Sequence, residues 1–245
     1  MCIRDSINND GIPDIAIGGW GSDPNGVDDA GRGMVIFGQS GMTSPFDLGT
    51  LNGTNGFYVN GVDTLGRLGW QTAPLGDINN DGIDDIIIGQ PNWKDGQLSG
   101  NGKAIVIYGK NGGFAASYDT DAISAADGMV ITGASFGDMA GMGIAGVGDI
   151  NGDGIDDIGV GSPAATVGGD MFTGISYVIY GSSSFGANFD LNNINGTNGF
   201  AIEGNTLGQG LGTVISPAGD LNNDGFDDMA IGAPGLFLML SLIHI

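Results

Sequence analysis

One pattern recurs about every seventy residues along this chain of 245 residues, and it restricts the possible fold more than any other feature. The pattern is a turn rich in aspartate, asparagine and glycine, followed directly by a short apolar run. Four such segments align, and their equivalent aspartates are separated by 71, 72 and 71 residues: Asp10, Asp81, Asp153 and Asp224. The chain is therefore built from repeats of one structural unit.

Three further segments keep the same register. They are a segment that begins with an aromatic residue (Phe46–Gly61, Tyr118–Gly133, Phe189–Gly204), an apolar run (Met34–Gly38, Ala104–Gly109, Ser176–Gly181) and a glycine-rich segment (Leu65–Asp77, Phe136–Asp149, Leu207–Asp220). Each period thus holds four pieces of strand length, which in the second unit are roughly Trp70–Pro74, Asp85–Ile88, Ala104–Tyr108 and Met129–Ile131. Because no segment has helical periodicity, the sequence predicts an all-β fold in which each repeat is one four-stranded antiparallel blade of a β-propeller. A β-sandwich is the alternative, and the matched glycines and loops argue against it.

The pattern resembles the FG-GAP repeat of integrin α-subunit propellers and their bacterial relatives. Two motifs carry the resemblance: Phe136-Gly137 with Leu65-Gly66 and Leu207-Gly208, and Gly232-Ala233-Pro234 with Gly89-Gln90-Pro91 and Gly161-Ser162-Pro163. The first unit departs from it, with Gly18-Gly19-Trp20. The resemblance covers residues 7–235 and implies a propeller of about seven blades, of which this chain holds two complete and two partial FG-GAP repeats. The remaining blades of the parent chain are then expected partners.

The expected boundaries are a partial blade at 7–61, blades at 62–133 and 134–204, and a partial blade at 205–239. We expect the tails 1–6 and 240–245 to be artificial, because one short DNA string can encode the first tail and its reverse complement the second. That string resembles the end of a sequencing adapter. The only cysteine, Cys2, and the only histidine, His244, lie in these tails, so the remaining chain offers no disulfide, thiolate or imidazole ligand.

The repeated turn has the residue types and spacing of a site for a hard cation. In the second unit Asp77, Asn79 and Asp81 alternate, Gly82 permits a sharp reversal, Ile83 offers its carbonyl, and Asp85 adds a carboxylate. Such an oxygen set favours Ca²⁺ over Mg²⁺, which prefers a tighter octahedron, and over zinc, which prefers sulfur and nitrogen. The equivalent predicted ligands in the other units are Asp149, Asn151, Asp153, Ile155 and Asp157; Asp220, Asn222, Asp224, Phe226 and Asp228; and Asn8, Asp10, Ile12 and Asp14.

Two alternatives compete with this calcium site. An EF-hand requires glutamate at its twelfth loop position, where these loops have Ile88, Val160 and Ile231, so that interpretation fails. Asx turns, chosen for backbone geometry alone, remain the structural alternative. The metal is expected to relieve repulsion among the carboxylates and so to contribute to folding.

Two positions in these loops stand apart from the rest. Ser6 occupies the first ligand position of the first loop; it belongs to the tail, and we expect the natural residue to be aspartate. The neighbours Asp84, Asp156 and Asp227 are expected to point away, because Pro13 replaces them in the first unit.

The formal net charge of −22 argues against nucleic acid and anionic membranes as partners. Glu203 is the only glutamate, so nearly all of the acid is aspartate, a turn former and hard-cation ligand. No apolar stretch is long enough to span a membrane. We expect a secreted or cell-surface protein.

The function that we expect is binding or adhesion. The resemblance implies calcium loops on one face of the disc and a protein or glycan ligand on the opposite face. The candidate docking loops are Gly19–Gly33, Asn92–Gly102 and Ala164–Gly174, where Trp20 and Trp93 could contact a ligand or pack between blades; Trp70 is expected in the core. No catalytic constellation is present. The alternatives are a non-catalytic propeller domain of a larger extracellular hydrolase and a purely structural surface repeat. The sequons at Asn52 and Asn195 fit turn formers better than glycosylation sites.

Overall fold

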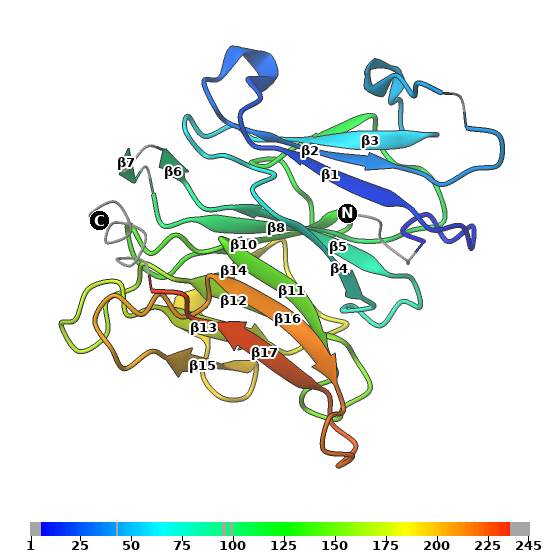
Figure 1. Ribbon diagram of the computed structural model, residues 1–245. Coiled ribbons are helices and arrows are strands. Elements are labelled where there is room, and N and C mark those ends of the chain that lie inside the picture. Colours follow the sequence, from blue (N-terminus) through cyan, green and yellow to red (C-terminus); the bar gives the residue numbers. More distant parts are fainter. Residues whose placement is uncertain (1–5, 43, 95–96, 99, 236–245) are drawn as a thin grey trace.

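The computed structural model describes residues 6–235 except 43, 95–96 and 99. Of the expected tails 1–6 and 240–245, residues 1–5 and 240–245, with Cys2 and His244, lie outside the described residues, and Ser6 is described. The described chain forms a row of β-sheets, which Figure 1 shows stacked face to face in sequence order. Only three short 3₁₀ turns interrupt the β-structure of the described chain, at Pro24–Gly26, Leu48–Thr50 and Leu191–Asn193. The fold is therefore all-β, and it is a partial β-propeller as predicted.

The strands group into sheets by repeat. The first sheet contains β1 (Ile15–Gly19), β2 (Arg32–Ile36) and β3 (Gly56–Asn60). The second contains β4 (Thr72–Gly76), β5 (Asp85–Gln90), β8 (Lys103–Ile107) and β10 (Gly128–Thr132). The third contains β11 (Gly143–Gly148), β12 (Asp157–Ser162), β13 (Ile175–Ile179) and β15 (Gly199–Glu203), and the fourth contains β16 (Val214–Gly219) and β17 (Asp228–Gly232). These strands pair antiparallel within each sheet, and β6 (Trp93–Lys94) and β7 (Gln97–Leu98) form a separate hairpin.

The four strands of the second unit lie within two residues of their expected bounds, and the first begins at Thr72 rather than Trp70. The sequence did not predict the parallel strand at the outer edge of the first and second sheets. β14 (Asn188–Asp190) comes from the third unit and pairs parallel with β10 of the second, and β9 (Ser117–Asp119) pairs in the same way with β3. Each of these strands therefore fastens one repeat to the outer edge of the sheet before it.

The core lies between neighbouring sheets. Ile86 and Ile88 of β5 pack with Phe57 of the first sheet, whereas Ile87 between them packs with Ile158 of the third. Successive side chains of a strand point to opposite faces, so a sheet buried on both faces needs a continuous apolar run. This explains the unbroken isoleucines of the second unit.

Glycine pairs set the spacing between sheets near the axis. A Cβ at Gly161 in β12 would lie 1.9 Å from the carbonyl oxygen of Gly212, and one at Gly89 in β5 would lie 2.1 Å from that of Gly141. The glycine of the Gly-X-Pro motif therefore packs on the glycine-rich segment of the next repeat. As a result the innermost strands β4, β11 and β16 lie side by side (Figure 1).

Within the described part of the chain, no helix is both long and apolar enough to cross a membrane.

Candidate metal centre

The topology places the acidic loops and the candidate docking loops at opposite ends of the strands. The acidic loops connect β4 to β5, β11 to β12 and β16 to β17, and a fourth precedes β1. The loops 19–33, 92–102 and 164–174 begin where β1, β5 and β12 end. Because each of these strands runs from one kind of loop to the other, the two sets of loops lie at different ends of the sheets.

Each acidic loop is curled around its first residue. The Asp77 carboxylate accepts the backbone N–H of Asp81 (3.0 Å) and of Gly82 (2.8 Å). Asn79 also accepts from the N–H of Asp81 (2.9 Å), and Asp81 accepts from that of Ile83 (2.9 Å). The residues at the first, third and fifth loop positions are thus joined in one hydrogen-bonded turn, in which Asp81 is exposed and Asp77 and Asn79 are half-buried.

The same bonds recur in the later loops. Asp149 and Asn151 accept from the N–H of Asp153, and Asp153 accepts from that of Ile155. In the fourth unit Asp220 and Asn222 accept from the N–H of Asp224, which accepts from that of Phe226.

The backbone of these turns explains why asparagine and glycine recur. Asn80 has φ 60° and Gly82 has φ 86°, both in the left-handed region. The fourth loop position is Asn9, Gly152 or Asn223 in the other units, with φ between 57° and 76°. Asparagine tolerates this region better than most residues, and glycine adopts it at no steric cost.

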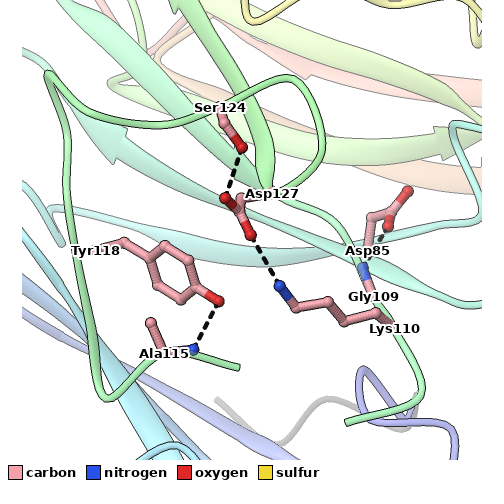
Figure 2. Close-up of polar contacts among 7 residues, drawn as sticks. All are labelled: Asp85, Gly109, Lys110, Ala115, Tyr118, Ser124 and Asp127. Carbon is pink, nitrogen blue, oxygen red and sulfur yellow. Dashed lines mark hydrogen bonds and ion pairs between the residues drawn. The ribbon is translucent and has the colours of Figure 1, made fainter. Parts of the chain in front are cut away.

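In the second loop the ninth position, Asp85, lies beneath the turn and is fully buried. Both oxygens of Asp85 accept backbone N–H groups, from Ile78 (3.1 Å) and from Gly109 (2.8 Å; Figure 2). Burial raises the pKa of Asp85 to about 8, nearby Asp81 and Asp77 raise it further, and the two hydrogen bonds oppose the rise. This carboxylate therefore ties the loop to the end of β8.

The equivalent aspartates repeat this arrangement where their partners are present. Asp157 accepts from Ile150 and Gly181, and Asp14 from Ile7 and Gly38; burial raises the pKa of each to about 6. Asp228 accepts from Leu221 (2.8 Å).

The burial of the side chain at the seventh loop position differs between the loops. The side chain of Ile83 is buried and that of Ile155 half-buried, whereas those of Ile12 and Phe226 are exposed. Only the backbone carbonyl of this position was predicted to bind an ion.

The first loop keeps its shape without a carboxylate at its first position. The Ser6 hydroxyl oxygen accepts from the N–H of Asp10 (2.9 Å) and of Gly11 (3.2 Å), as Asp77 does in the second loop. Asn8 accepts from the N–H of Asp10 as well. The turn conformation therefore needs only an oxygen acceptor there, while the charge is lost.

The residues present fit a hard divalent cation. Each of the three later loops offers carboxylate and amide oxygens without sulfur or imidazole, and the aspartate at its fifth position is exposed. Carboxylate oxygens retain lone pairs beyond one N–H bond. The negative charges of Asp77 and Asp81 help to raise the pKa of Asp85 below them, and a bound cation would oppose that rise. Calcium would be held by these oxygens and would neutralise the excess negative charge.

Sequence reasoning missed the role of the eighth loop position. Asp156 and Asp227 do point away from their own loops, but they bond the backbone of the preceding loop. It also missed the network beside the second loop in Figure 2, where the Lys110 ammonium bonds Asp127 (2.8 Å), which accepts from the Ser124 hydroxyl (2.6 Å). A cavity of about 320 Å³ lies between this network and the loop, bordered by Asn79, Asp81 and Lys110.

At the other end, Trp20 is 45% exposed and packs 6.1 Å from half-buried Trp70, with the Arg67 guanidinium 4.5 Å from its ring. Its contacts thus lie largely in the junction between the first two sheets. Three further carboxylates gather in the same loop, Asp23, Asp28 and Asp29, and no sequence spacing had pointed to them. The side chain of Trp93 lies outside the described residues.

The FG-GAP repeat family matches residues 68–107 and 211–237, which span the inner strands and acidic loops of the second and fourth units. The chain carries FG-GAP repeats. The glycine-rich segment, acidic loop and Gly-X-Pro motif of these repeats lie where neighbouring sheets meet. The FG-GAP repeat is a non-catalytic propeller module.

Relatives of this FG-GAP chain include phospholipases D and integrins. The phosphatidylinositol-glycan-specific phospholipase D of Rattus norvegicus is 32% identical over 163 residues, covering 66% of this chain and 18% of that protein. The phospholipase D of the same name from Bos taurus is 30% identical over 186 residues, covering 76% of this chain and 21% of that protein. Integrin alpha-8 of Gallus gallus is 26% identical over 204 residues, covering 83% and 18%. The chain thus spans about a fifth of the length of these relatives.

Proposed function

We propose that this chain is a calcium-binding propeller module of a secreted or cell-surface protein, and that it binds a protein or glycan partner on the face opposite the acidic loops. One observation carries the calcium proposal. Three loops hold the same set of hard oxygen donors, Asp-Asn-Asp, in the same hydrogen-bonded turn, and the last aspartate of the set is exposed in each loop. A purely conformational role does not require a full carboxylate at the first position, because Ser6 supports the same turn.

Thermal unfolding tests the calcium proposal directly. We expect the melting temperature of the whole chain to fall in excess chelator and to be restored by Ca²⁺ but not by equimolar Mg²⁺, because ligand bound only to the folded state stabilises it. The variants Asp81→Asn and Asp153→Asn should weaken this response, whereas Asp121→Asn, an exposed aspartate outside the loops, should not. An unchanged melting temperature in excess chelator refutes calcium binding.

The proposed docking face rests on the topology of the loops. Loops 19–33, 92–102 and 164–174 differ between repeats while the strands that carry them repeat, as is typical of binding loops on a fixed scaffold. A glycan array probed in Ca²⁺ and in chelator tests this assignment. Binding that Trp20→Ala and a loop 164–174 replacement both abolish supports it, and binding that only acidic-loop variants abolish places the partner at the other end.

A role as the propeller domain of a larger extracellular hydrolase is the second candidate, because several relatives are phospholipases D. Here too the chain contributes binding rather than chemistry. Hydrolysis of glycan or ester substrates by the isolated chain would contradict both candidates, because neither assigns it a catalytic residue.

A further inference from the structure

The carboxylate at the eighth position of each later loop lies against the first residue of the preceding loop. Asp156 Oδ2 accepts the backbone N–H of Asp77 (3.0 Å), and Asp227 Oδ2 accepts that of Asp149 (3.0 Å). The backbone N–H of Ser6 bonds Asp84 in the same way. Each bond crosses from one repeat to the next, and the residue it holds occupies the first loop position, which is a predicted ligand in the second and third loops.

Backbone hydrogen bonds reinforce this contact. The N–H of Asp156 donates to the carbonyl oxygen of Asp77 (3.4 Å), and that of Ser182 donates to Ile78 (2.9 Å). One repeat earlier, the N–H of Lys110 donates to Ile7 (2.9 Å). The following blade thus holds the first two residues of the loop through both side-chain and backbone bonds.

The contact requires glycine just before the first ligand. A Cβ at Gly76 would lie 2.1 Å from Asp156 Oδ2, and one at Gly148 would lie 2.2 Å from Asp227 Oδ2. Both glycines also have positive φ, 72° and 75°. The two repeats are therefore fitted to each other at this point.

Burial of the second loop residue depends on the following blade. Ile7 and Ile78, which a sheet with its outer strands follows, are 1% and 0% exposed. Ile150, followed by the two strands β16 and β17, is half-buried. Leu221, which no sheet follows among residues 6–235, is 76% exposed. Loops of nearly the same sequence therefore differ in how firmly their first residues are held.

We propose that Asp84, Asp156 and Asp227 are positioning residues that couple cation binding in each loop to docking of the following blade. This inference rests on the proposed calcium binding and deepens it. Loops 77–85 and 149–157 then bind calcium more tightly than loop 220–228, although all three have the same acidic positions. Pro13 at this position gives the first repeat no carboxylate for a preceding loop.

A loop-resolved titration tests the coupling. The amide signals of Gly82, Gly154 and Gly225, the sixth residues of the three loops, are followed by ¹⁵N NMR of the whole chain as CaCl₂ is added. In the unmodified chain we expect Gly225 to saturate at a higher calcium concentration than the other two. Removal of a charge-assisted hydrogen bond weakens an interaction by about tenfold. Asp156→Ala should therefore raise the midpoint at Gly82 about tenfold and leave Gly154, in its own loop, within about twofold.

Asp227→Ala is the matched control, because it should raise the midpoint at Gly154 and spare Gly82. Asp156→Asn keeps an acceptor oxygen for the Asp77 N–H, so its effect at Gly82 should be smaller than that of Asp156→Ala. Equal changes at Gly82 and Gly154, or changes confined to the loop that carries the substitution, overturn the coupling while leaving calcium binding intact. Absence of calcium-induced shifts at all three glycines in the unmodified chain refutes the proposed calcium binding itself.

Discussion

Substitution of Gly161 by alanine tests whether the Gly-X-Pro motif sets the spacing between blades. Gly161 lies in β12, where the added Cβ would be 1.9 Å from the carbonyl oxygen of Gly212 and 2.7 Å from its carbonyl carbon. These atoms are backbone of the neighbouring repeat, so no side-chain rotation can relieve the clash. The third and fourth sheets must move apart instead.

The size of the effect follows from these distances. Ordinary contact begins near 3.4 Å, so the two backbones must separate by about 1.5 Å at this point. Overpacking of a well-packed core costs about 1–3 kcal/mol, and a backbone obstacle places Gly161→Ala near the upper end. For a domain of this size we therefore expect the melting temperature to fall by roughly 6–12 °C.

The assay is thermal unfolding followed by circular dichroism in saturating Ca²⁺, with Gly186→Ala as the control. A methyl group added at Gly186 would have no neighbouring atom within 4 Å, and this glycine has no positive φ. The same chemical change should therefore alter the melting temperature by about 1 °C or less at this position. If Gly161→Ala has the same melting temperature as Gly186→Ala, the glycine contact does not determine the spacing of the sheets.

Three further changes have defined expectations. Gly82→Ala meets no neighbouring atom but places a side chain at φ 86°, so urea unfolding should show a loss of about 1–2 kcal/mol. Gln71 donates to the Ile144 carbonyl (3.0 Å) and accepts from its N–H (3.3 Å), so Gln71→Ala should cost about 1–3 kcal/mol in the same assay; no loss would mean that this link between the second and third sheets is dispensable. The hydrogen bond from Lys110, followed by that from Ser124, lowers the pKa of Asp127. The contribution of ionised Asp127 to stability is therefore present above the unfolded pKa of about 3.9 and is lost as pH falls through the lower folded pKa. Asp127→Asn should lower the free energy of unfolding by less than about 1 kcal/mol at pH 6, and this loss should shrink towards pH 3.

The sequence predicted the fold well because each repeat has the same order of strand-length apolar runs and turns. The apolar run Ile86–Ile88 predicts a strand buried on both faces, and the structure places its residues in two different clusters. The parallel strands β9 and β14 could not be predicted in this way. Their pairing depends on where one repeat meets the edge of another. The sequence of a segment such as Asn188–Asp190 has no pattern that indicates which strand it pairs with.

The acidic loops were predictable in composition but only partly in geometry. Alternation of Asp77, Asn79 and Asp81 predicted one compact turn, and in the structure Asp77 and Asn79 both accept the N–H of Asp81. The same spacing could not show that Asp85 lies beneath the turn with both oxygens bonded to backbone. It also left Asp156 without a role, because its partner belongs to the preceding repeat.

Repeated sequence therefore does not make equivalent sites in a propeller fragment. Asp85 and Asp228 occupy the same loop position, yet Asp85 is fully buried and bonded to the end of its third strand, whereas Asp228 is only half-buried. A group's affinity for a cation depends on its desolvation and its hydrogen bonds as well as on its identity. Since both are supplied by the rest of the blade and by the blade that follows, the number of calcium ions that a chain of FG-GAP repeats binds tightly should depend on how many of its loops are followed by a complete blade. The loop 77–85, which the complete third sheet follows, is the one where this dependence should be seen most directly.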